Sequence, residues 1–158
     1  MRKINQIGII LEELSASQLS YFAIKNVNEY IEDSLDDFVI FFENITGTVI
    51  QPEFATMAIN EIWSFNGTAV ATSVSTALSL LKSHSVTKKY FYVWDLEWSR
   101  RHGRDYDYIS AAYINPEIKL IARSKDHATA IENYCNRKVS GIVPNFNITK
   151  LMDIINHE

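Results

Sequence analysis

The chain has 158 residues and a formal net charge of −4, from 15 lysine and arginine residues against 19 aspartate and glutamate residues. Its hydrophobic content of 47%, with only five glycines and three prolines, excludes a disordered or fibrous protein. The length is typical of a single domain, and the net negative charge argues against a general polyanion binder.

Targeting and cysteine patterns exclude several further classes of protein. No apolar run approaches the roughly 20 residues that a membrane helix needs, and the amino-terminal residues lack the pattern of a secretory signal. The single cysteine, Cys135, rules out an internal disulfide framework and a cysteine-based zinc cluster. These patterns predict a cytoplasmic protein without membrane contact.

Two kinds of apolar periodicity alternate along the first half of the chain. Residues 4–11 predict a short strand, and the serines of 15–17 supply capping hydroxyls for a helix whose apolar positions recur up to Ile31. The compact run 38–42 is typical of a strand buried on both faces. Residues 43–54 predict a loop with a short edge strand at 48–50, and residues 56–64 predict another strand.

The second half continues this alternation, and its strongest strand pattern is the aromatic and β-branched run 89–94. The expected elements are a helix over 69–83, the strand 89–94, a polar stretch over 95–107, a short helix or turn over 108–113, a strand over 118–122, a helix over 124–136, a strand over 141–143 and a helix over 148–155.

About six strands therefore alternate with four or five helices, without internal repeats. Buried strands joined by helix-length crossovers favour a parallel sheet covered on both faces. We expect one three-layer, Rossmann-like α/β domain with a mostly parallel sheet, spanning residues 1–158. Ligands of such sheets bind beyond the carboxyl ends of the strands, which directs attention to the loops 11–17, 43–47, 64–68, 94–107, 122–127 and 144–147.

The first of these loops argues against a nucleotide cofactor. It contains no glycine after Gly8, and it carries Glu12 and Glu13, which would repel a phosphate. Neither the dinucleotide-binding fingerprint nor a P-loop lysine is present. The same loop argues against a small nucleotide-binding or signalling domain of flavodoxin-like order, and we expect no cofactor.

The loop after the strongest strand, residues 94–105, combines three kinds of side chain that bind ligands. Asp95 and Glu97 alternate and can point to one side, while Trp94 and Trp98 offer flat faces on which a sugar or base could stack. Arg100, Arg101 and Arg104 could hold phosphate or carboxylate groups. The alternative is a solvated loop with compensating charges and tryptophans packed on the sheet edge.

Two histidines are candidates for acid–base chemistry. His127 falls in the first turn of an expected helix, and His102 lies among the charged residues of the 94–105 loop; both positions are also compatible with plain surface residues. The four histidines show no metal-ligand spacing, so we expect no protein-built metal site. Single-stranded nucleic acid would suit the arginines and aromatic residues, but the net acidity of the chain disfavours it.

From about residue 56 onward, the order of elements resembles the amino-terminal, acceptor-side domain of GT-B-type glycosyltransferases. The matching segments are INEIWSFNGTAVATSVSTALSLLKS, KKYFYVWDLEW, the run from Leu120 to His127 and the run from Gly141 to Asn147. The resemblance implies a cleft that binds acceptor hydroxyls, with a carboxylate or histidine as base. The positions that it places at the cleft are Glu61, Ser64, Asn66, Asp95, Glu97, Ser124 and Asn145.

The chain departs from this family at three points. Glu12 and Glu13 replace a glycine-rich loop, Phe146 stands where the family has glycine, and the donor domain that would follow is absent from this sequence. The resemblance thus implies a free-standing acceptor-side half, either silent alone or completed by a partner domain or a second copy.

Our leading interpretation is a glycosyltransferase-like domain that binds a sugar or nucleotide-sugar at the carboxyl ends of its strands. Asp95 or His102 would act as the base. The ligand-binding candidates are Glu61, Ser64, Asn66, Trp94, Glu97, Trp98, Arg100, Arg101, Arg104, Ser124, His127 and Asn145. The alternative is a non-enzymatic protein-interaction module with a Rossmann-like core, which the aromatic residues between Tyr90 and Tyr113 would serve as a partner surface.

Overall fold

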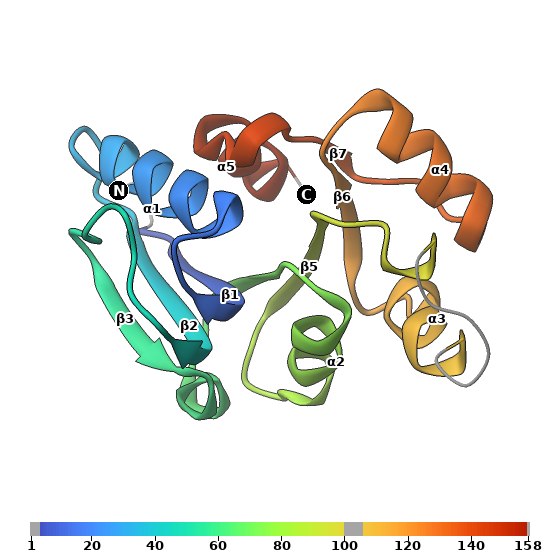
Figure 1. Cartoon of the computed structure of the whole chain (residues 1–158), viewed down its shortest axis with the longest axis horizontal. Coiled ribbons are helices and arrows are strands. Elements are labelled where there is room, and N and C mark those ends of the chain that lie inside the picture. Colours follow the sequence, from blue (N-terminus) through green and yellow to red (C-terminus); the bar gives the residue numbers. More distant parts are fainter. Residues whose placement is uncertain (1–3, 100–105, 158) are drawn as a thin grey trace.

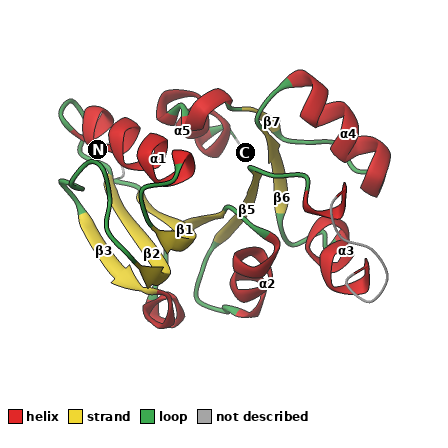
Figure 2. Cartoon of the chain, in the orientation of Figure 1, coloured by secondary structure: helices red, strands yellow, loops and turns green. Residues whose placement is uncertain are grey.

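The computed structural model describes residues 4–99 and 106–157, which form one parallel sheet covered by helices on both faces (Figures 1 and 2). The sheet has seven strands in the order β3-β2-β1-β4-β5-β6-β7, and every neighbouring pair is parallel. This confirms the three-layer, Rossmann-like α/β fold predicted from the sequence, with seven strands instead of about six.

The elements follow one another in regular alternation along the chain. They are β1 (Gln6–Leu14), α1 (Gln18–Ile31), β2 (Asp37–Ile45), β3 (Ala55–Ala58), a 3-10 helix (Ile59–Ser64), β4 (Thr68–Ala71), α2 (Val74–Lys82), β5 (Lys88–Val93), a 3-10 turn (Glu97–Ser99), α3 (Tyr106–Ile114), β6 (Lys119–Ala122), α4 (Lys125–Cys135), β7 (Gly141–Ile142), a 3-10 turn (Pro144–Phe146) and α5 (Ile148–Asn156).

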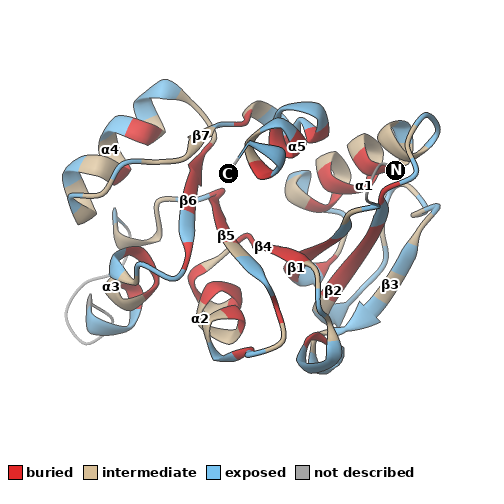
Figure 3. Cartoon of the chain, turned by 180° about the vertical axis from the view of Figure 1, so that it is seen from behind, coloured by how far each residue is buried: buried red, intermediate tan, exposed pale blue. Residues whose placement is uncertain are grey.

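The core consists of two hydrophobic clusters, one on each face of the sheet. Successive side chains of a strand point to opposite faces, so Tyr90 and Tyr92 of β5 join one cluster while Phe91 and Val93 join the other. Helices α1 and α5 complete the first cluster, and α2, α3 and α4 complete the second. Figure 3 shows that burial concentrates in the central strands, whereas the edge strand β3 is mostly exposed.

The segment between residues 55 and 71 differs from the sequence prediction. The expected strand over 56–64 is only the four residues of β3 followed by a 3-10 helix, and the expected helix over 69–83 is β4 followed by α2. The small residues Thr68 to Ala71 fit a helical pattern, but they form a strand because both of its faces are buried. No strand forms at 48–50.

This correction moves the loop 64–68 to the opposite end of the sheet, because it precedes a strand instead of following one. Gly67 lies against the start of β1, where a Cβ atom at residue 67 would stand 2.2 Å from the carbonyl oxygen of Gln6. Only glycine allows this close approach of the two backbones.

The side chain of Tyr92 in β5 joins the carboxyl end of the sheet to the segment that follows β7. Its hydroxyl donates to the carbonyl oxygen of Val143 and accepts from the backbone N–H of Phe146 at 3.2 Å. Burial raises the pKa of Tyr92 to about 12, against the opposing effects of the Phe146 hydrogen bond and the Arg123 charge. Tyr113 is also fully buried, but its hydroxyl has no hydrogen-bond partner among the described residues.

The two tyrosines give a matched pair of variants. Tyr92→Phe leaves a buried carbonyl and a buried N–H without their partner and should lower the free energy of unfolding by about 1–3 kcal/mol. Tyr113→Phe removes a hydroxyl without a described partner and should leave stability unchanged or raise it. Urea denaturation at pH 8 measures both, and equal losses in the two variants would contradict the assigned hydrogen bonds.

The raised pKa of Tyr92 also makes the stability of the fold depend on pH in the alkaline range. Because the pKa of Tyr92 is higher in the folded state than its ordinary value of 10.0, its contribution to stability is complete below pH 10 and is lost as pH rises toward about 12. Between these values, stability should fall more steeply in the wild-type chain than in Tyr92→Phe. Parallel slopes in urea denaturation would contradict this assignment.

Candidate functional site

The strand order creates a crevice between β1 and β4. The chain runs from β1 outward to β2 and β3, and then returns to the other side of β1 with β4. Ligands of open parallel sheets bind at such a switch point, beyond the carboxyl ends of the strands. A cavity of about 400 Å³ lies at this point, lined by Glu12, Glu13, Ser15, Ser17, Gln18, Leu19, Thr72, Ser73, Trp94, Asp95 and Glu97. We call it the switch-point cavity.

Serine side chains shape the wall formed by the turn between β1 and α1. Ser17 caps α1 by accepting from the backbone N–H of Ser20 at 3.2 Å. The buried hydroxyl of Ser20 in turn donates to the carbonyl of Glu13 at 3.1 Å and accepts from the N–H of Ser15. These bonds fix a turn that has no glycine, and they hold the amino end of α1 at the cavity.

The opposite wall is built by the turn between β4 and α2. The hydroxyl of Thr72 donates to the carbonyl of Ile10 at 2.7 Å, which ties the end of β4 to β1. Ser73 and Thr76 cap α2 reciprocally in a capping box. The carboxylate of Glu97 accepts from the N–H of Val74 at 2.7 Å, so a side chain of the loop after β5 occupies the positive end of the α2 dipole.

Trp94 forms the floor of the cavity and is 9% exposed. The guanidinium of Arg123, at the end of β6, lies 3.7 Å from the centre of its ring, and Nη1 donates to the Trp94 carbonyl at 3.0 Å. Phe22 of α1 packs against the same indole, with ring centres 6.3 Å apart. The indole therefore contacts a cation and two aromatic rings, those of Phe22 and Tyr92.

The lining of the switch-point cavity is acidic. Glu12, Glu13 and Asp95 are exposed and Glu97 is half-buried, while the described part of the chain places no lysine, arginine or histidine on the lining. The amino ends of α1 and α2 offset only part of this charge. A phosphate would be repelled here, whereas hydroxyl groups can donate to carboxylates and exchange hydrogen bonds with the serine and threonine hydroxyls.

Three of the site residues predicted from the sequence, Trp94, Asp95 and Glu97, come together in this cavity. Trp98 does not line it: its indole stacks on Tyr134, with ring centres 4.2 Å apart, and meets Tyr113 edge-on. The expected stacking face of Trp98 is thus occupied by the protein itself. Arg100, Arg101, His102 and Arg104 lie outside the described residues.

The placement of Glu61, Ser64 and Asn66 at the cleft is wrong. Glu61 and Ser64 belong to the 3-10 helix after β3 and line another cavity, of about 790 Å³, beside the beginnings of β1 and β2. Asn66 is exposed just before β4. All three therefore lie toward the amino ends of the strands, because the segment that was expected to end in a binding loop leads into β4.

The remaining predicted residues lie at the carboxyl ends of β6 and β7, outside the switch-point cavity. Ser124 caps α4 by accepting from the backbone N–H of His127 at 3.1 Å. The Nδ1 atom of His127 is buried and has no hydrogen-bond partner among the described residues. Asn145 lines a separate groove between α1 and the segment that leads into α5.

Sequence reasoning missed Thr72, Ser73 and Arg123. Thr72 and Ser73 follow β4 directly. The sequence pattern predicts a helix over 69–83, which places both residues inside that helix instead of in a loop after a strand. Arg123 directly follows the strand predicted over 118–122, so its position after a buried strand was a usable signal.

Comparisons with known proteins assign no family to this chain: no family model, no curated protein and no solved structure matches it. Among the described residues, no helix is long and apolar enough to cross a membrane, and no group of three or more histidine, cysteine, aspartate or glutamate residues is arranged to hold a metal ion. The fold and the switch-point cavity are therefore the basis for a functional proposal.

The Glu97 contact with α2 can be tested by two variants that remove the same charge. Glu97→Gln weakens a charge-assisted hydrogen bond and the interaction with the helix dipole, and should cost about 1 kcal/mol of stability. Glu13→Gln, in the same cavity, removes an exposed carboxylate and should be neutral or slightly stabilising, because it relieves repulsion among the acidic residues. Urea denaturation measures both; equal effects would contradict the role of Glu97.

Proposed function

We propose that the chain is a glycosyltransferase-type domain that binds the acceptor sugar, a neutral carbohydrate, in the switch-point cavity. The observation that carries this proposal is the composition of the cavity lining, which joins four carboxylates with serine and threonine hydroxyls at the carboxyl ends of β1, β4 and β5. Those ends are where parallel α/β sheets bind their ligands. Two of the positions that the resemblance to acceptor-side GT-B domains implies, Asp95 and Glu97, belong to this lining.

The charge of the cavity distinguishes the acceptor from the donor of such a reaction. A nucleotide-sugar carries a diphosphate, which needs cationic side chains or free helix N–H groups. Glu97 already occupies the N–H of Val74 at the amino end of α2, and the described lining has no cationic side chain. A sugar acceptor needs neither, so we assign the nucleotide-sugar to a site formed by a partner domain or a second copy.

Asp95 is the proposed base for transfer. Asp95 is an exposed residue of the cavity lining, and its carboxylate would take the proton of an acceptor hydroxyl. The acceptor oxygen then bonds to the anomeric carbon of a nucleotide-sugar, and the bond from that carbon to the diphosphate breaks, so the diphosphate leaves with the bonding electron pair. A general base must reach the proton that it removes, and the exposed position of Asp95 on the lining supports this role.

Asp95→Asn tests the proposed site. The wild-type chain is screened on a microarray of mono- to tetrasaccharides of hexoses and N-acetylhexosamines, and the affinity for the strongest glycan is measured by calorimetry. Loss of a hydrogen bond to a charged group should weaken binding about ten- to a hundredfold. Asp37→Asn, an exposed position at the start of β2, is the matched control and should bind normally.

Two results would contradict the proposal. One is equal binding by Asp95→Asn and the wild-type chain. The other is stabilisation of the chain by free uridine diphosphate with no response to any glycan, because the acidic cavity disfavours a diphosphate.

The second candidate function is a protein-interaction module. The surface that favours it lies near the edge strand β3, not at the aromatic residues between Tyr90 and Tyr113. Tyr90, Tyr92, Trp94 and Tyr113 are buried, so they form no exposed aromatic patch. The exposed apolar side chains near the edge strand β3 include Met57 and Trp63. A dimer that is detected by light scattering and abolished by Trp63→Ser, in a chain that binds no glycan, would favour this function.

A further inference from the structure

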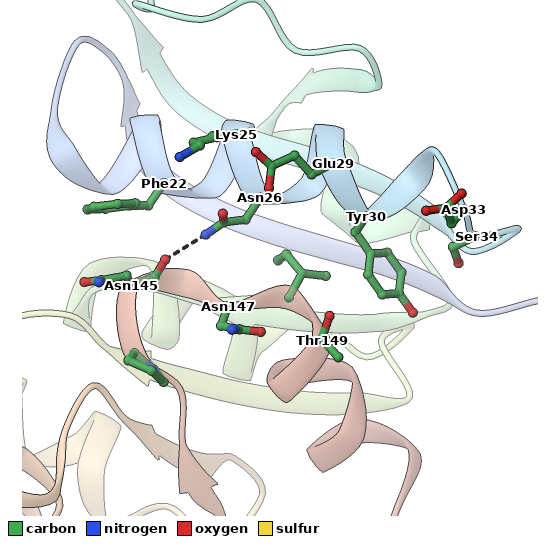
Figure 4. A pocket seen from close by; sticks show the side chains of 12 residues that line it. Phe22, Lys25, Asn26, Glu29, Tyr30, Asp33, Ser34, Asn145, Asn147 and Thr149 are labelled. Atoms are coloured by element: carbon green, nitrogen blue, oxygen red, sulfur yellow. Dashed lines mark hydrogen bonds between the residues drawn. The ribbon is translucent and has the colours of Figure 1, made fainter.

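A groove of about 610 Å³ lies between α1 and the segment that leads into α5 (Figure 4). Lys25 and Glu29 of α1 form one wall, and Asn145, Asn147 and Thr149 form the other. Its volume is in the range of small-molecule sites. The proposed acceptor cavity does not include it, and of the positions that the sequence resemblance places at a cleft, only Asn145 lines it. We call it the α1–α5 groove.

Two aromatic rings connect this groove with the switch-point cavity. Phe22 lines the groove and Trp94 lines the cavity, and their ring centres are 6.3 Å apart. Leu19, one turn before Phe22 on α1, also lines the cavity. In Figure 4, Phe22 and Asn145 lie at the same end of the groove. The groove and the cavity are therefore neighbours along α1, and the contact between Phe22 and Trp94 lies where they adjoin.

The wall opposite α1 is held in an uncommon backbone conformation that presents amide side chains. Asn145 and Phe146 have φ values of 48° and 59°, in the left-handed region. The side-chain amide of Asn26 donates to the carbonyls of both residues, at 2.7 and 2.9 Å, and the Tyr92 hydroxyl holds the N–H of Phe146. Such conformations persist only where the surroundings impose them, and they concentrate at ligand sites.

The available polar groups on this wall suit hydroxyl groups. The side-chain amide of Asn145 makes no hydrogen bond within the described residues, and Asn147 uses only Oδ1, which accepts from the N–H of Lys150 at 3.0 Å. Both residues are exposed. Amides donate and accept at once, as sugar hydroxyls require, and the charged residues of the lining, one cation (Lys25) and two carboxylates (Glu29 and Asp33), disfavour an anionic ligand.

We propose that the α1–α5 groove is a second carbohydrate subsite, so that the ligand of this protein is an extended neutral glycan whose terminal sugar occupies the switch-point cavity. This inference rests on the proposed function and specifies its substrate class: an oligosaccharide, with the units behind the reacting end recognised by Asn145 and Asn147.

Asn145→Gly is the decisive variant because glycine adopts the left-handed backbone without strain. The substitution removes the amide side chain and keeps the fold. Asn136→Gly is its matched control: Asn136 is exposed, ends α4 with a φ of 57°, and does not line the groove. The probes are the tetrasaccharide that binds best on the microarray described above and its terminal monosaccharide, both titrated by calorimetry.

The wild-type chain and Asn136→Gly should bind the tetrasaccharide about tenfold more tightly than the monosaccharide, the gain expected from one or two additional hydrogen bonds. Asn145→Gly should lose most of that gain while binding the monosaccharide normally. Equal affinity of the wild-type chain for both probes, or an undiminished gain in Asn145→Gly, would overturn the second subsite alone. Absence of glycan binding in the wild-type chain would overturn the proposed function with it.

Discussion

The burial of β1 on both faces is the constraint on which the rest of the structure depends. Ile7, Ile9 and Leu11 pack into one hydrophobic cluster and Ile10 into the other, while the backbone pairs with β2 on one side and β4 on the other. A strand that is covered in all four directions has to lie in the interior of the sheet, not at its edge. The crossovers to β2 and β4 then run in opposite directions, and the crevice between their turns follows from that geometry.

The local periodicity of the chain is strong wherever a segment is long and its burial is regular, and there the sequence predicts the fold well. The run Phe38 to Phe42 and the aromatic run of β5 become buried strands, and Ser17 and Ser124 cap their helices as their positions indicate. The prediction fails at β4, because its four residues, Thr68 to Ala71, fit the helical pattern that continues into α2. Their strand conformation comes from pairing with β1 and β5, which are distant in sequence.

The residues of the candidate site could be predicted from the sequence only where the neighbouring strand was predicted correctly. The loop after β5 was identified because it follows the strongest strand pattern, and it supplies Trp94, Asp95 and Glu97 to the cavity. Thr72 and Ser73 were missed together with β4, and Glu61 and Ser64 were assigned to the wrong end of the sheet for the same reason. The acidic turn after β1 is visible in the sequence, but its place in the same cavity as Glu97 depends on strand order, which alternation alone does not determine.

Asn145 and Phe146, which follow β7, have left-handed backbone conformations that are unfavourable for residues other than glycine. A non-glycine residue in this conformation costs about 1–3 kcal/mol, and β7 contributes only two residues to the sheet. The segment 143–147 is therefore held by side-chain contacts from α1 and β5 more than by its own strand pairing. Because Val143 and Phe146 are themselves part of the core, the segment joins α1, β5 and β7 into one packed unit.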